Sequence, residues 1–371
     1  MIKTIMVIME KSKRIFYFDF LRAMAIIGII FCHSSVSYIV NDMGTFNFYT
    51  TAFYDCFRDF CVPIFVMLSG ALLIGKKDSL LIFFKKRLSR ILIPFIFWAL
   101  ISIAYSFIYI QQSIDIDNAI DIFLGHGGTL GVTFWFVWMI IIVYIGIFII
   151  NKAVEFGNKK YDCFEKKFIS ILTVISVIYI ILFQFQFFSP EYNRSLLSYY
   201  LSFLAYAVIG HFIVNSDFLE SHIQTKWLVI IFSILSALSY TSYICYYVVP
   251  TSLASNSFRY LSYFTYEILI ISVAIFLTVK FISNTHSFKK LEAGKISGII
   301  NAISKYSFGI YLCHYLVLYI LKMNMIQYID FPHQNSIIWI PIFVVITLMI
   351  SFAILWLLNN VPYLKKVSGV S

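Results

Sequence analysis

The chain has 371 residues, of which 61% are hydrophobic and 12% are charged, and its formal net charge is +10. Soluble domains usually carry about twice this share of charged residues, so the composition excludes an ordinary water-soluble protein. In a membrane protein the positions of Lys and Arg report topology, so the positive charge is not taken as a sign of nucleic-acid binding. We therefore expect a protein that spans a membrane many times.

Ten stretches of the chain are long and apolar enough, or nearly so, to cross the hydrocarbon layer, which takes about 20 residues of helix. They are residues 15–40, 60–75, 91–111, 132–151, 168–187, 195–214, 227–248, 261–281, 307–323 and 336–358. The longest connection, 282–306, has 25 residues and leaves no room for a soluble domain. The predicted fold class is therefore all-α, a polytopic membrane protein of about ten transmembrane helices. Residues 1–371 are expected to form a single transmembrane domain.

The distribution of basic residues predicts the orientation. Of the 28 Lys and Arg residues, 23 fall in segments on the same side as the N-terminus. Four fall on the opposite side, namely Arg58, Arg194, Arg259 and Lys322. Because Lys and Arg are enriched on the cytoplasmic side, we expect both termini in the cytoplasm.

The first apolar stretch carries three ionisable side chains, Asp19, Arg22 and His33. Such groups are costly inside a membrane, so each one needs a partner or a function. Asp19 and Arg22 are three residues apart, a spacing at which helical side chains can pair. Arg22 and His33 are eleven residues apart, so they share a helical face and lie roughly 16 Å apart along its axis. The same spacing also fits a structural ion pair and a histidine bonded to a neighbouring helix.

Five segments carry a recognisable pattern in chain order. They are DFLR (19–22) with His33 following Arg22, VPIFVMLSGALL (62–73), FFKKRLSRILIPFIFW (83–98), TFWFVWMI (133–140) and ISKYSFGIYLCHYLVL (303–318). Together they resemble the acyltransferase-3 family of integral membrane acyltransferases, of the glycan O-acetyltransferase type, over essentially the whole chain. One departure is Thr133, which stands where the family often has a His before its Trp-Phe pair.

The resemblance implies transfer of an acyl group, usually acetyl, from cytoplasmic acyl-CoA to a hydroxyl of a cell-surface or lipid-linked glycan. Such a transfer needs a base near the hydroxyl oxygen, and His suits that task at neutral pH. His33 is the candidate base, and a covalent acyl-histidine at this position is the alternative. Arg22 is expected to bind the donor's phosphate or pantetheine amide, or to stabilise charge on the thioester oxygen, while Asp19 orients Arg22. No metal is expected.

The basic segment before the third stretch, which contains Lys85, Lys86, Arg87 and Arg90, has two interpretations. Such a cluster can be a topology determinant that is attracted to anionic membrane lipid. The family resemblance instead makes Lys86, Arg87 and Arg90 candidates for binding the CoA phosphates, together with Arg22 and Ser69. Arg87 and Arg90 are three residues apart, which places them on one helical face.

Two further ionisable residues lie inside predicted spans. His314 follows Tyr311 by three residues, so their side chains can touch, and it is either a second-rank catalytic candidate or a structural histidine. Glu267 lies near the outer end of its span, at about the expected depth of His33. Its carboxylate can orient the imidazole of His33, or it can pair with Arg259 or a nearby Tyr.

The connection 111–131 contains apolar residues at 116, 120, 123 and 124, which predict a short amphipathic helix at the membrane surface. With Trp135 and Trp138 next to it, this helix can form the floor of a sugar site, although Trp at this depth is usually an interface residue. The alternative function is a polytopic transporter or flippase of glycan intermediates, with Arg22 and His33 lining its path. Many transporters use paired broken helices, which the sequence does not indicate.

Overall fold

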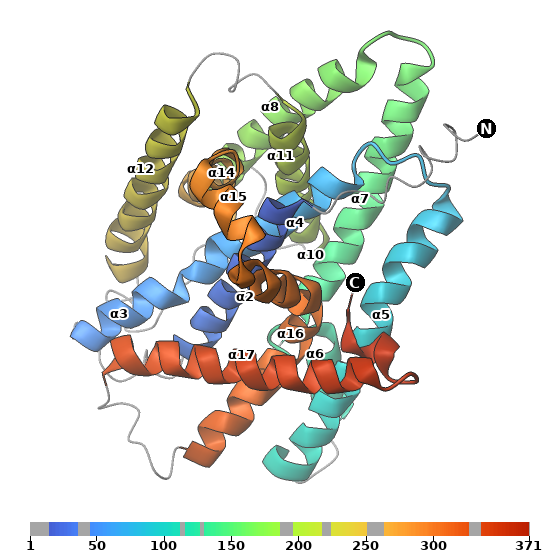
Figure 1. Cartoon of the computed structure of the whole chain (residues 1–371). Coiled ribbons are helices and arrows are strands. Elements are labelled where there is room, and N and C mark those ends of the chain that lie inside the picture. Colours follow the sequence, from blue (N-terminus) through green and yellow to red (C-terminus); the bar gives the residue numbers. More distant parts are fainter. Residues whose placement is uncertain are drawn as a thin grey trace.

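The computed structural model describes residues 15–35, 45–111, 116–126, 130–185, 196–216, 224–250, 263–325 and 335–370. Every regular element in these described residues is a helix, which confirms the predicted all-α class (Figure 1). The first elements are α2 (Phe16–Ser35), α3 (Phe46–Asp55), α4 (Phe57–Leu73), α5 (Leu80–Tyr105), η2 (Ser106–Gln111), α6 (Ile116–Leu124), α7 (Trp135–Asn158) and α8 (Phe164–Gln184). The remaining ones are α10 (Leu196–Ser202), α11 (Leu204–Asn215), α12 (Thr225–Tyr243), η3 (Ile244–Val248), α14 (Tyr266–Ile282), α15 (His286–Ala293), α16 (Lys295–Met325), α17 (Ser336–Asn360) and η5 (Lys365–Ser368).

The number of membrane crossings agrees with the sequence prediction. Within the described residues, nine helical spans are long and apolar enough to cross a membrane, and the bent pair α14–α15 raises the number to ten if it counts as one span. The axes of α14 and α15 differ by 81°. The protein is therefore a multi-pass membrane protein, while the side on which its termini lie stays a prediction.

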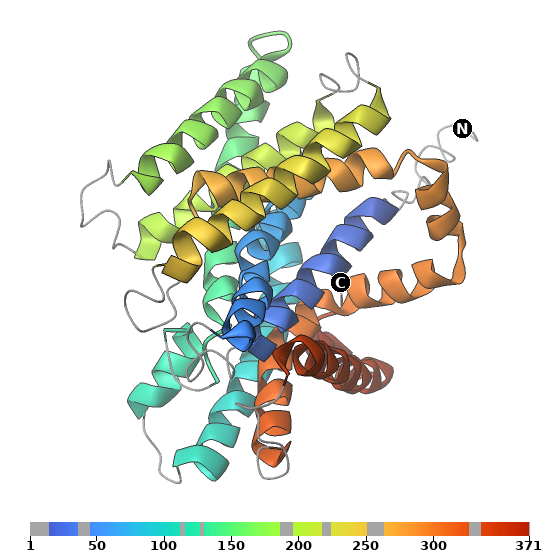
Figure 2. The same ribbon diagram turned by 90° about the vertical axis from the view of Figure 1, so that its left-hand side faces the viewer.

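Helix α2 occupies the interior of the bundle, where it packs between α4 and α16 (Figures 1 and 2). In the most apolar part of α2, 61% of the residues are buried inside the protein, against 11% in the α12–η3 span. Most of the α12–η3 span is therefore on the surface of the bundle, whereas α2 lies among other helices. This arrangement is the one expected when charged groups inside a membrane must be paired or used.

Close packing of α4 on α11 explains the Ser-Gly pair of the second motif. A Cβ atom added to Gly70 would lie 1.9 Å from the Ala207 carbonyl oxygen, and one added to Gly210 would lie 2.2 Å from that of Met67. Both glycines therefore let the two backbones touch, as small residues do between membrane helices. This contact fixes the position of Ser69, the neighbour of Gly70.

Several helix boundaries differ from the prediction. The second span begins at Phe46, with α3, rather than at residue 60. Helix α5 begins at Leu80 rather than at residue 91, so the basic segment is helical and Pro94 lies inside the helix. Helix α16 begins at Lys295 rather than at residue 307. Hydropathy marks the part of a helix that crosses the hydrocarbon layer, and both helices continue beyond it with charged turns. The first predicted stretch included residues 36–40, which lie outside the described residues.

The predicted surface helix in 111–131 is present as α6. The indole Nε1 of Trp138 donates a hydrogen bond to the Phe123 carbonyl oxygen at 3.1 Å, which ties α7 to α6. Trp135 packs against the rings of Tyr200, Phe203 and Tyr263. Both Trp side chains thus serve the packing of this region, and their suggested role under a sugar stays a prediction.

Candidate functional site

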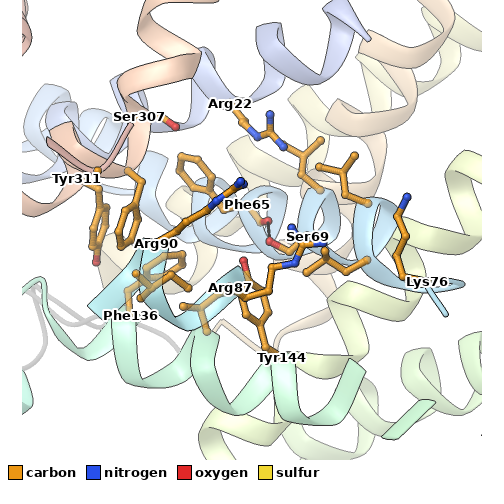
Figure 3. A pocket seen from close by; sticks show the side chains of 17 residues that line it. Arg22, Phe65, Ser69, Lys76, Arg87, Arg90, Phe136, Tyr144, Ser307 and Tyr311 are labelled. Carbon is orange, nitrogen blue, oxygen red and sulfur yellow. Dashed lines mark hydrogen bonds between the residues drawn. The ribbon is translucent and has the colours of Figure 1, made fainter. Parts of the chain in front are cut away.

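A cavity of about 480 Å³ lies where α2 begins, α4 ends and α5 begins (Figure 3). Helices α2, α4, α5, α7 and α16 contribute its walls, and Gly369 of the C-terminal tail closes one side. Four cationic side chains line it, namely Arg22, Lys76, Arg87 and Arg90, and no Asp or Glu among the described residues does. A concave surface with several cations and no acidic residue suits a ligand that carries negative charge.

Arg87 and Arg90 project from the first turns of α5 into this cavity, as their spacing predicts. Among the described residues neither side chain forms a salt bridge. The Nε atom of Arg87 is buried and has no hydrogen-bond partner in that part of the chain. A buried donor without a partner is costly, so these arginines are available to an anionic ligand.

Lys86 does not line this cavity, unlike Arg87 and Arg90. It lies on the other face of α5, where its Nζ atom is 3.6 Å from the Asp78 Oδ1 atom, and more than half of its side chain is exposed. The reason is helical geometry, since successive residues on a helix point about 100° apart. A sequence neighbour of Arg87 therefore need not point into the cavity.

Asp19 and Ser304 position Arg22. The Arg22 guanidinium nitrogen lies 3.7 Å from the Asp19 Oδ1 atom, as the i, i+3 spacing predicted. The Ser304 hydroxyl of α16 donates a 2.5 Å hydrogen bond to the same oxygen. Asp19 is 2% exposed, so the carboxylate is buried and needs these partners. The interaction joins α2 to α16 beside the cavity.

Ser69 and Tyr144 lie opposite Arg22 across the cavity, in the centre of Figure 3. The Ser69 hydroxyl donates to the Phe65 carbonyl oxygen at 3.0 Å. Ser69 and Tyr144 line the same cavity as Arg22 and Arg87. Polar hydroxyls next to the cations provide further sites for hydrogen bonds to a bound molecule.

The rest of the cavity is mostly apolar, and Ser307 and Tyr311 add two hydroxyl groups. Leucine, isoleucine and phenylalanine side chains from α4, α5, α7 and α16 form most of its walls, namely Phe65, Leu68, Leu72, Leu73, Ile91, Phe136, Ile140 and Phe308. A cavity of this size, with cationic and apolar walls, fits a ligand that has both anionic and uncharged parts.

The second part of the site is a pair of histidines beyond the cavity. His33 of α2 and His314 of α16 lie with ring centroids 5.3 Å apart, and the Tyr315 ring is 5.1 Å from His33. The two imidazoles come from opposite ends of the sequence and meet because α2 packs on α16. Neither one lines the cavity itself.

The hydrogen bonds of His314 determine which ring nitrogen carries the proton. Its Nδ1 atom lies 2.7 Å from the Tyr311 carbonyl oxygen and 3.1 Å from that of Ile310. A carbonyl oxygen accepts and cannot donate, so Nδ1 is the protonated nitrogen and Nε2 of the neutral ring has the lone pair. Nε2 is buried without a hydrogen-bond partner among the described residues. His314 thus presents a free basic nitrogen next to His33.

Two cations lie near His33. The Lys322 ammonium donates a 3.1 Å hydrogen bond to the His33 carbonyl oxygen. Arg58 is the second, and its Nε atom forms a 3.1 Å salt bridge with the buried Asp59. His33 is partly exposed, whereas His314 is fully buried, so an incoming molecule can reach His33 first. Positive charge near the imidazole can stabilise negative charge that develops in a reaction there.

Comparison with known proteins identifies the family. Residues 15–356 match the profile of an acyltransferase domain, Acyl_transf_3. The chain belongs to the acyltransferase-3 family. Membership implies that the protein is a transferase that uses an acyl donor and an acceptor. No curated protein and no solved structure matches the chain.

Glu267 is apart from the histidine pair in this acyltransferase. Its Oε2 atom accepts a 3.3 Å hydrogen bond from the Gln184 side chain of α8, and none of its described contacts is with His33. The suggestion that Glu267 orients the imidazole therefore finds no support, because depth in the membrane does not specify which side of a helix faces the site. The interaction ties the start of α14 to the end of α8.

Several residues of the site were missing from the sequence prediction. Tyr144 lies in an apolar stretch without any marking pattern, and Lys76 was counted only as a topology signal. Ser304 belongs to the last motif, and a hydroxyl residue inside a motif was a signal that could have found it. Gly369 lines the cavity because Gly309 lets the tail approach α16, since a Cβ there would lie 2.2 Å from the Ser368 carbonyl oxygen. No local pattern predicts that contact.

Proposed function

We propose that this acyltransferase moves an acetyl group from cytoplasmic acyl-CoA to a hydroxyl group of a cell-surface or lipid-linked glycan. The observation that carries the proposal is the cavity whose described lining combines four cationic side chains, no Asp or Glu, and many apolar side chains. Acyl-CoA combines the matching groups, because its phosphates are anionic and its pantetheine arm is largely uncharged. The family adds the acyl-transfer chemistry.

The donor is proposed to bind with its diphosphate against Arg22, Arg87 and Arg90, where guanidinium groups can form paired hydrogen bonds with phosphate oxygens. Its pantetheine arm then follows the apolar wall toward Tyr311. The cavity volume of about 480 Å³ falls within the range of about 300–1,000 Å³ that is typical of small-molecule sites. The adenosine is left at the mouth of the cavity.

His33 is the proposed base. The acceptor oxygen attacks the thioester carbonyl carbon, so that a C–O bond forms and the C–S bond breaks. The imidazole takes the hydroxyl proton and returns it to the CoA thiolate, which leaves as the thiol. Roughly 16 Å of helix axis separates Arg22 from His33, so Arg22 is assigned to the donor's phosphate or amide groups rather than to the thioester oxygen. Arg58 and Lys322 supply positive charge near that oxygen.

The orientation follows from the basic residues. Their 23 to 4 distribution favours a cytoplasmic position for the cavity, where acyl-CoA is present, and an outer position for the histidine pair. The plasma membrane is the proposed location, since a glycan acceptor reaches the outer side there. Anionic membrane lipid is a further partner of the basic segment.

Mass spectrometry of surface glycans tests the proposal. Cells are compared that contain the wild-type protein, the His33→Ala variant at equal abundance in the membrane, or neither protein. Acetyl esters are expected with the wild type and not in the other two samples. Glycans that are identical in all three samples, while purified protein still binds CoA, would overturn the assigned acceptor.

A further inference from the structure

Three aromatic rings form the end of the cavity that is farthest from Lys76. They are Phe65 of α4, Phe136 of α7 and Tyr311 of α16. Among the residues of its helix that line the cavity, each is the one nearest the histidine pair. The ring centroids of Phe65 and Phe136 are 6.3 Å apart, and those of Phe136 and Tyr311 are 4.8 Å apart. We call these three residues the aromatic end wall. Figure 3 shows Phe136 and Tyr311 at the opposite end from Lys76.

Tyr311 separates the cavity from the histidines. Its ring lies 5.8 Å from that of His314. His314 is one turn further along α16 and belongs to the second part of the site. Its carbonyl oxygen also accepts the hydrogen bond from His314 Nδ1. The same residue therefore ends the donor cavity and orients the buried imidazole.

The wall is held in place by packing and by one hydrogen bond. Tyr311 is 5% exposed and Phe136 is 7% exposed, so both rings are enclosed by other side chains. The Tyr311 hydroxyl donates a 2.5 Å hydrogen bond to the Thr133 carbonyl oxygen, close to the start of α7. A closely packed interior does not yield freely to a larger group. The space beyond the wall is thus available only when Tyr311 turns aside.

We propose that the aromatic end wall selects the acyl group of the donor by size, with Tyr311 as the specificity-determining residue. The inference rests on the proposed function, because it assumes that acyl-CoA occupies the cavity. The thioester must cross the plane of the wall to meet His33, and the opening left by one displaced aromatic ring admits acetyl more readily than longer or branched acyl groups. Each additional methylene that must fit a restricted pocket changes selectivity by roughly 10- to 200-fold.

The test measures kcat/KM for acetyl-CoA and butyryl-CoA on the same preparations of purified full-length protein. In wild type the acetyl donor is expected to be preferred by at least about tenfold. Tyr311→Ala is expected to reduce that preference by about tenfold or to reverse it. Because both donors are measured on one sample, loss of folded protein leaves the ratio unchanged.

Matched variants complete the experiment. Ile140→Ala removes a side chain from the same cavity one turn away from the wall, and it should keep the wild-type ratio. Tyr311→Phe keeps the ring, loses the bond to Thr133, and should keep the acetyl preference. If Tyr311→Ala does not fold, Phe136→Ala opens the same wall and should give the same shift in ratio.

The outcomes separate the two proposals. A wild-type protein that binds neither acetyl-CoA nor butyryl-CoA in equilibrium measurements overturns the proposed donor. A protein that binds and uses both donors equally well, or whose ratio is the same in Tyr311→Ala, Phe136→Ala and wild type, overturns the size selection and leaves the donor assignment standing.

Discussion

The imidazoles of His33 and His314 lie against each other where α2 meets α16, with their ring centroids 5.3 Å apart. The carbonyl oxygens of Ile310 and Tyr311 hold the proton of His314 on Nδ1. As a result, a nitrogen with a free lone pair is buried beside the partly exposed His33. Two histidines that were separate candidates in the sequence thus form one unit in the fold.

The first prediction concerns this unit. His33→Ala should lower turnover by about 100-fold or more, the usual effect of losing a positioned base, while affinity for acyl-CoA stays near wild type. His314→Ala should also lower turnover. The double variant should be little slower than the slower single variant, because residues that act as a unit give non-additive losses. Single-turnover rates and donor binding measured on each variant check this.

A well-folded His33→Ala protein that acylates at the normal rate would end the proposed role of His33. His314 would then be the next candidate for the base. Retention of monodisperse protein after purification in detergent is the control for insertion and folding in all of these variants.

The second prediction concerns Arg22 and its support. Arg22→Ala should weaken donor binding, and Arg22→Lys should restore it poorly, because a compact ammonium does not reproduce the planar guanidinium. Ser304→Ala removes one hydrogen bond to Asp19 and should raise the KM for acyl-CoA by about two- to tenfold at an unchanged kcat. Full rescue by Arg22→Lys would contradict the assigned contact with the donor.

A third prediction follows from the contact between Glu267 and Gln184. Glu267→Gln keeps the shape of a side chain that does not line the cavity, so turnover and both KM values should stay close to wild type. If kcat falls as far as it does in His33→Ala while the protein remains folded, Glu267 acts on the imidazole after all, and the separation of the two groups is wrong.

The fourth prediction concerns orientation. A reporter fused after Lys160, in the connection between α7 and α8, should be cytoplasmic, and one fused after Asp121 in α6 should be external. The two fusions sit on opposite ends of α7 and so form a matched pair. The reverse pattern would place the cationic cavity on the outside, where acyl-CoA is absent.

The helical architecture was predictable from sequence because apolar length and charge report directly on a membrane helix. The i, i+3 relations were predictable for the same local reason, and Asp19–Arg22 and Arg87–Arg90 are both found as expected. The contacts that could not be predicted from the sequence depend on which helices pack against each other. The pairing of His33 with His314 and the separation of Glu267 from both arise from the packing of α2 on α16 and of α14 on α8.

Lys86 illustrates a limit of a different kind. Its charge and its position in the basic segment made it as strong a candidate for phosphate binding as Arg87. Of the two, only Arg87 faces the cavity. A rotation of about 100° per residue separates a ligand-facing side chain from a lipid-facing one, and which face is turned inward depends on tertiary packing.

The binding of CoA to purified full-length protein, measured by isothermal titration calorimetry, tests the central claim most directly. The Arg87→Gln, Arg90→Gln double variant loses two charged contacts, each worth about 1.5–3 kcal/mol, so it should bind CoA about 100-fold more weakly or not measurably. Lys86→Gln changes a charge on the same helix outside the cavity and should bind as the wild type does. Equal affinities of the wild-type, double-variant and Lys86→Gln proteins would contradict the assignment of the cavity to the acyl donor.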